Sequence, residues 1–169
     1  MKRSKVLWQV GGVTFTAVLG TILHFLYGWT GCELFAPISA INESTWEHMK
    51  LLFFPSFIFA IFQSLFFKDE QKGFWWVKLI GILIGLMAIP VLFYTYNGAI
   101  GKSPDWLNIS FFFIALFFEY FIEYRLFKAN KIKNSNKIIP LAILSIIGIL
   151  FIIFTFFAPS LPIFIPPEI

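Results

Sequence analysis

The sequence predicts an all-α membrane protein, a polytopic bundle of about five membrane-spanning helices whose N-terminus is cytoplasmic. Three observations predict it: the apolar composition, five long runs without charged residues, and the uneven distribution of lysine and arginine among the connectors. Hydrophobic residues make up 59% of the chain and charged residues 13%, whereas soluble domains carry about 25% charged residues. A soluble fold could not bury this much apolar surface, so the expected environment is a lipid bilayer.

The five apolar runs set the expected helices. A membrane-spanning helix needs about 20 residues, because the bilayer core is roughly 30 Å thick. Trimmed by their polar flanks, the runs predict helices near 6–27, 50–67, 74–96, 107–127 and 138–157. Five such helices with short connectors use all 169 residues, so we expect a single transmembrane domain over residues 1–169.

The basic residues predict the orientation, because cytoplasmic loops accumulate lysine and arginine. With the N-terminus inside, 11 of the 13 basic residues lie on the cytoplasmic side and Lys50 and Lys102 lie outside. The eleven are Lys2, Arg3, Lys5, Lys68, Lys72, Lys78, Arg125, Lys128, Lys131, Lys133 and Lys137. Topology therefore explains the net charge of +4, and no nucleic-acid partner is expected.

A polar segment, residues 42–50, precedes the second apolar run and is the most informative part of the chain. Its sequence is Asn-Glu-Ser-Thr-Trp-Glu-His-Met-Lys. Asn42 or Ser44 can cap a helix, and Ser44 with Glu47 has the spacing of a capping box. The candidate ligand-binding residues in this segment are Asn42, Ser44, Trp46 and Lys50.

The same segment carries a family resemblance. Residues 42–50, followed by the apolar run Leu51–Pro55, resemble the Asn-Glu-Ser-x-Trp-Glu-His-x-Lys signature of an uncharacterised family of small bacterial membrane proteins. His24 and Tyr27 match the pattern of that family, and length and hydropathy are similar over nearly the whole chain. The function of this family is unknown. The resemblance therefore implies a multi-pass protein of a bacterial plasma membrane, and it implies no particular activity.

Two histidines and two carboxylates suggest a metal site at the outer surface. His24 lies about one turn from the outer end of its helix, and His48 lies in the polar segment with Glu43 and Glu47. Imidazole and carboxylate ligands suit zinc or a similar divalent ion, with one acid left as a general base. The expected metal ligands are His24, His48 and Glu47, and the candidate catalytic residues are Glu43 and Glu47. Alternatively, the acids only cap the helix while His48 and Lys50 sit among lipid headgroups.

A second candidate lies deeper, because Glu119 is about 12 residues, or ~18 Å, from the outer end of the fourth predicted helix. Ionisable residues at such depth usually face the bundle interior or a water-filled cavity. Gln63, Thr14 and Ser145 are expected at similar depth and could form a polar layer with Glu119. Glu119 is then either a relay for a proton, an ion or a small solute, or a packing carboxyl hydrogen-bonded between helices.

Two further pairs have a plainer interpretation. Glu123 and Arg125 are expected to form an ion pair at the cytoplasmic interface. Gly81 and Gly85 have the small-xxx-small spacing of closely packed membrane helices, within one chain or between chains.

Three functions therefore remain open from the sequence. The first is an outward-facing site that binds a divalent metal or small ligand, with hydrolysis of a lipid or other amphiphile as one use. The second is transport of a proton, an ion or a small solute with Glu119 as relay. An odd number of spans argues against a standard transporter fold built from repeats. A homo-oligomer could restore the symmetry that such repeats provide. The third is a scaffold or accessory subunit.

Overall fold

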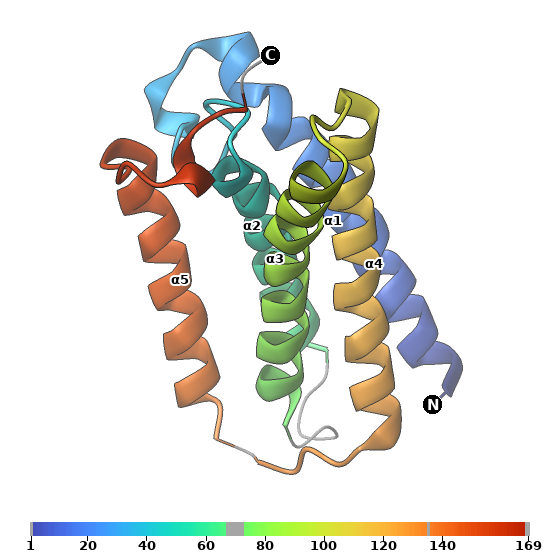
Figure 1. The fold of residues 1–169 in the computed structure, drawn as a ribbon. Helices are drawn as coiled ribbons and strands as arrows, with labels where there is room; N and C mark the ends of the chain where they lie inside the picture. The colour runs from blue at the N-terminus through green and yellow to red at the C-terminus, as the bar shows by residue number, and fades with distance from the viewer. Residues whose placement is uncertain (1, 67–72, 135, 168–169) are drawn as a thin grey trace.

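The computed structural model describes residues 2–66, 73–134 and 136–167 (Figure 1). Within these ranges the α-helices are α1 (Lys2–Thr30), α2 (Thr45–Ser64), α3 (Phe74–Ala99), α4 (Asp105–Ala129) and α5 (Ile138–Phe156). Two short 3-10 turns lie at one end of the bundle: η1 (Glu33–Phe35) in the connector between α1 and α2, and η2 (Pro162–Phe164) in the segment after α5. These ranges contain no β-strand, which confirms the all-α class.

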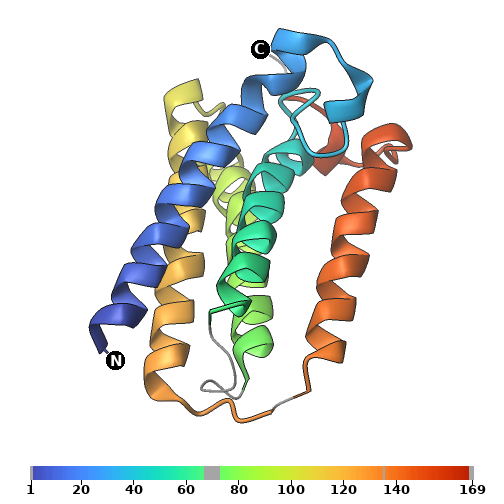
Figure 2. The same cartoon turned by 180° about the vertical axis from the view of Figure 1, so that it is seen from behind.

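The helices run up and down, so the two termini lie at opposite ends of the bundle (Figure 1). We call the end that holds η1, the start of α2 and the C-terminus the η1 end. Seen from behind, α1 lies beside α4, while α5 stands at the other side of the bundle against α2 and α3 (Figure 2). Helix α2 is central, because it contacts each of the other four helices.

Four of the described helices have the length and composition of membrane spans. They are Lys5–Thr30, Phe74–Ala99, Trp106–Ala129 and Ile138–Phe156. Large apolar side chains on their outer faces, such as Val10, Met87, Phe117 and Ile149, are exposed on the bundle. This arrangement fits a membrane-embedded protein, because lipid tails rather than water then surround those side chains. A fifth span, through α2, stays a prediction.

The second helix differs most from its prediction. It was expected near 50–67, and it begins at Thr45 and ends at Ser64. Ser44 caps this helix, so its first turn contains the polar residues that precede the apolar run. A prediction based on apolarity therefore placed the start of α2 too late. The other four helices begin and end within four residues of their expected limits.

The contact between α3 and α4 depends on two glycines that face carboxylate side chains. A Cβ atom added to Gly81 would lie 2.4 Å from Cγ of Glu123, and one added to Gly85 would lie 3.1 Å from Cβ of Glu119. The small-xxx-small pair of the sequence therefore serves close packing inside the chain. It lets α3 approach α4 where α4 carries its two buried acids.

We expect Gly81→Ala to destabilise the bundle by about 1–3 kcal/mol, because the new methyl group has no room against Glu123. Thermal unfolding in detergent micelles measures the effect. Gly98→Ala is the matched control in α3, since a Cβ atom added there would meet no neighbouring side chain or helix within 4 Å. Equal losses of stability in the two variants would contradict this account of the α3–α4 contact.

Candidate functional site

The loop between α1 and α2 is fixed to the last turns of α1 through Ser39. The buried hydroxyl group of Ser39 donates a hydrogen bond to the carbonyl oxygen of Leu23 and accepts one from the N–H of Tyr27 at 3.0 Å. In a regular α-helix the carbonyl oxygen of Leu23 would accept a hydrogen bond directly from the N–H of Tyr27, four residues later. The N–H of Ala40 also donates to Leu23 at 3.4 Å. The loop therefore lies against α1 immediately beside His24.

The polar residues before α2 shape its N-terminus. Ser44 Oγ accepts a hydrogen bond from the N–H of Glu47 at 3.4 Å, and the N–H of Ser44 donates to Asn42 Oδ1 at 2.9 Å. The Glu47 carboxylate accepts from the N–H of Ile41 at 3.0 Å. Asn42 and Ser44 are thus turn and cap residues. The capping box is only half formed, because Glu47 bonds to Ile41 rather than to Ser44.

Lys50 occupies the interior of the η1 end rather than its surface. Its side chain is fully buried, and its ammonium group contacts Glu47 Oε2 at 2.7 Å. It also donates to the carbonyl oxygen of Ala36 and to Oγ1 of Thr155, both at 2.8 Å. All three donors of the ammonium group are used. The alternative that placed Lys50 among headgroups is therefore wrong.

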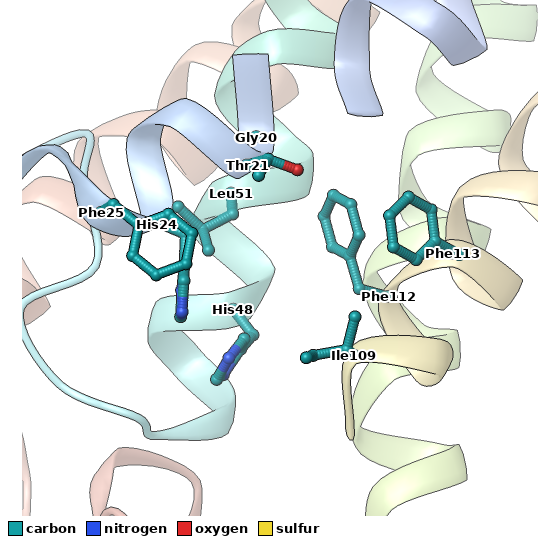
Figure 3. A pocket seen from close by; sticks show the side chains of 9 residues that line it. All are labelled: Gly20, Thr21, His24, Phe25, His48, Leu51, Ile109, Phe112 and Phe113. Carbon is teal, nitrogen blue, oxygen red and sulfur yellow. The ribbon is translucent and has the colours of Figure 1, made fainter. Parts of the chain in front are cut away.

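Three side chains converge on one point at the η1 end, and we call them the His-Glu-His cluster: His24, Glu43 and His48. One ligand atom of each lies within 4.8 Å of those of the other two. Glu43 Oε1 lies 3.8 Å from His24 Nε2, and Glu43 Oε2 lies 3.4 Å from His48 Nε2. The ring centroids of the two histidines are 5.6 Å apart. Figure 3 shows both rings, from α1 and α2, projecting into the same space.

Glu47, expected as a metal ligand, is not part of this cluster. Its carboxylate is 3% exposed and is engaged by Lys50. Glu43 occupies the place in the ligand set that was assigned to Glu47, and its side chain is 59% exposed. The ligand set that the structure brings together is therefore His24, Glu43 and His48.

The orientation of His48 determines which of its atoms faces the cluster. His48 Nδ1 lies 3.0 Å from the carbonyl oxygen of Ser44, which can only accept a hydrogen bond, so Nδ1 carries a proton. In a neutral ring Nε2 then presents a lone pair to the Glu43 carboxylate. Two acceptors in this position need a cation between them, either a proton or a metal ion. When that cation is a proton on His48 Nε2, hydrogen bonding to His48 lowers the pKa of the Glu43 carboxyl below its usual value.

A cavity of about 130 Å³ adjoins the two histidines between α1, α2 and α4. His24 and His48 lie on one side of it, and Phe112 and Phe113 lie on the other (Figure 3). Its lining is mostly apolar. Ile109 and Phe113, which also line it, are 58% and 46% exposed on the outer surface of the bundle. The cavity thus leads from the lipid-facing surface to the His-Glu-His cluster.

Trp46 lies on a different face of α2 from His48. Its ring packs against Phe151 and Phe164 with centroid distances of 4.5 and 4.7 Å. Phe164 belongs to η2, so the C-terminal segment packs over Trp46. Trp46 therefore holds η2 against the bundle.

The polar layer expected around Glu119 has different members. Glu119 and Gln63 are fully buried, as expected. Thr14 and Ser145, however, are exposed on the outside of the bundle, so they do not surround Glu119. Counting residues along a helix gives a depth, but it does not give the side of the helix on which a residue lies. The Ser56 hydroxyl of α2 faces Glu119 instead.

The expected pair of Glu123 with Arg125 is wrong. Glu123 is buried and forms an ion pair with Lys78 at 2.6 Å, whereas Arg125 is exposed. From the sequence, Lys78 was expected among the cytoplasmic lysines, and its pairing with Glu123 was not predicted. The depth of the two residues in the membrane could have predicted the pair. Lys78 lies in the second turn of α3, and Glu123 lies about two turns before the end of α4, at the same end of the bundle.

Comparison with known proteins gives a family and no activity. A family model described as "Family of unknown function (DUF6512)" matches residues 1–167. No curated protein and no solved structure matches the chain.

We expect Lys50→Met to destabilise the protein by about 3–5 kcal/mol, because Glu47 is left buried without its partner. The double variant Lys50→Met/Glu47→Gln should recover part of the loss. Thermal unfolding in detergent measures both, with Lys102→Met as the control at an exposed lysine. A Lys50→Met protein as stable as the control would show that the ammonium group does not hold the η1 end together.

Proposed function

Because the chain belongs to a family of unknown function (DUF6512), its activity has to be inferred from its site, and we propose that His24, Glu43 and His48 bind a divalent metal ion such as zinc. The observation that carries the proposal is the convergence of three ligand atoms within 4.8 Å. Tetrahedral zinc with ligands at 2.0–2.2 Å places its ligand atoms about 3.3–3.6 Å apart. The contacts of Glu43 Oε1 with His24 Nε2 at 3.8 Å and of Glu43 Oε2 with His48 Nε2 at 3.4 Å are close to that spacing.

The hydrogen bond between His48 and Ser44 supports the same proposal. Metal-binding histidines usually donate their second ring N–H to a carbonyl or carboxylate, which fixes the ring and directs the other nitrogen to the metal. His48 Nδ1 at 3.0 Å from the Ser44 carbonyl has this arrangement. Because Ser44 is also the cap of α2, the fold of this helix start orients the ligand.

The composition of the ligand set favours catalysis over a purely structural role. Structural zinc sites usually have four protein ligands, whereas catalytic sites have three and keep a position open for water or substrate. Two histidines and one carboxylate form such a three-ligand set. When bound, the metal would supply a water whose pKa is lowered to about 7 and would polarise a carbonyl group. Glu47 has no role in this chemistry, because Lys50 and Ile41 already bind its carboxylate.

The adjoining cavity favours an amphiphile with an acyl chain as the substrate. Its lining is mostly apolar, and His24 and His48 are both part of it. An acyl chain lying between Phe112 and Leu51 would bring the polar end of the same molecule to the histidines. Hydrolysis of an ester in such a molecule is the reaction we propose for this site.

We further propose that the protein lies in the plasma membrane of a bacterial cell, with the η1 end outside the cytoplasm. The support is the distribution of basic residues. Lys128, Lys131, Lys133 and Lys137 are exposed at the end opposite η1, and Lys102 is exposed at the η1 end.

We expect the detergent-purified protein to contain near-stoichiometric zinc or another divalent ion, measured by elemental analysis. His24→Ala, His48→Ala and Glu43→Gln should each reduce the content at least about 10-fold, because three-ligand sites lose most of their affinity with one ligand. Glu33→Gln, at an exposed acid in the same loop, is the matched control and should retain the metal. A wild-type protein without metal after supplementation would contradict the proposal.

We expect the metal-loaded protein to hydrolyse 4-nitrophenyl esters in mixed micelles, with kcat/KM rising with acyl chain length, since each buried CH₂ group contributes about 0.8 kcal/mol. Ile109→Trp, at the mouth of the cavity, should remove the dependence on chain length and leave the metal content unchanged. Ile114→Trp, also exposed on α4, is the control. Equal rates for all chain lengths in the wild type would exclude the cavity as an acyl site.

A further inference from the structure

Three charged residues lie inside the bundle, away from the His-Glu-His cluster: Lys78 of α3 and Glu119 and Glu123 of α4. The exposed fraction of each is 1% or less. Lys78 and Glu123 form an ion pair at 2.6 Å, so these two charges compensate each other. Glu119 is the additional acid. If it were ionised, the bundle would hold one uncompensated negative charge at membrane depth.

The surroundings of Glu119 do not stabilise such a charge. Among the described residues, neither carboxyl oxygen of Glu119 has a hydrogen-bond partner. Oε1 of Glu123 and Oε1 of Gln63 are also buried without partners. The groups that face Glu119 are the Ser56 hydroxyl of α2, Lys78 of α3 and Glu123 of its own helix. An ionised carboxylate that has no hydrogen-bond donor from the protein is strongly disfavoured in a low-dielectric interior.

The space beside the carboxyl group also limits what can neutralise it. A Cβ atom added to Gly85 would lie only 3.1 Å from Glu119 Oε2, so α3 packs directly against this oxygen. Glu119 itself is 0% exposed. A hydrated metal ion does not fit between the carboxyl group and α3, whereas a proton needs no additional space.

Hydroxyl groups next to Glu119 form a connected row. Tyr120 Oη lies 2.9 Å from Thr16 Oγ1, and Thr16 Oγ1 lies 3.5 Å from Ser56 Oγ. Hydroxyl groups both donate and accept hydrogen bonds, so this row can accept from a neutral acid. Ser56 is the member of the row that faces Glu119.

We propose that Glu119 is a proton-binding site, in which the carboxyl group carries a proton in the folded protein at neutral pH and the Ser56, Thr16 and Tyr120 hydroxyls line its surroundings. The ligand is the proton alone. The Lys78–Glu123 pair completes the site by keeping the remaining charge balanced. This proposal does not depend on metal binding at the His-Glu-His cluster, which shares none of its residues.

Infrared difference spectroscopy of the detergent-purified, full-length protein at pH 7 tests the proposal. We expect the C=O stretching band of a protonated carboxyl group, with a downshift in D₂O, to be present in the wild type and absent in Glu119→Gln. The amide of glutamine resembles a neutral acid in shape, so this variant should keep the wild-type thermal midpoint. Glu33→Gln is the control and should keep the band.

Three results would overturn the proposal. The first is the absence of a protonated-carboxyl band in the wild type at pH 7. The second is a band that persists in Glu119→Gln and disappears in Glu123→Gln, which would place the proton on the other acid. The third is loss of the band when sodium chloride replaces choline chloride, which would identify a metal cation as the ligand. His24→Ala should leave the band unchanged, so failure of the metal site and failure of this proposal are distinguishable.

Discussion

The buried ammonium group of Lys50 joins the three segments that meet at the η1 end of the bundle. Its acceptors are Glu47 at the start of α2, Ala36 in the loop after α1 and Thr155 at the end of α5. A charge without water is stable only when its donors are paired. Together with Ser39, which holds the loop against α1, this group fixes the position of the loop and therefore of Glu43 relative to the histidines.

The same constraint operates at the other end of the bundle. Lys78 and Glu123 pair inside it, and Gly81 allows α3 to approach closely enough for the 2.6 Å contact. Exposed positions on the helices are largely apolar, whereas the interior contains the paired charges. This distribution is expected where the surroundings are hydrocarbon, because polar groups then gain more from partners inside the protein than from the outer surface.

The two candidate sites differ in their access to the surroundings. The His-Glu-His cluster includes a largely exposed carboxylate and adjoins a cavity whose lining residues reach the lipid-facing surface. Glu119 is enclosed within the bundle and contacts the glycine face of α3. An open cluster with an exposed carboxylate suits exchange of a ligand with the surroundings. An enclosed acid suits the smallest ligand, a proton.

The sequence by itself determined the helical class, the approximate limits of the helices and the burial of Glu119. Each of these follows from the hydropathy of one continuous run, because the bilayer selects for length and apolarity along the chain. It also identified residues 42–50 as the polar segment of interest, and the resemblance drawn from that segment to a family of unknown function agrees with the family model.

Only the tertiary structure decided which polar residues meet. Sequence gives the depth of Thr14, Ser145 and Lys78, but the side on which each projects depends on how the helices pack. Glu43 and Glu47 are equivalent acids in the sequence. In the structure Glu47 pairs with Lys50, and Glu43 lies beside the two histidines. The physical reason is that pairing energies depend on distances between helices, and no local pattern encodes those distances.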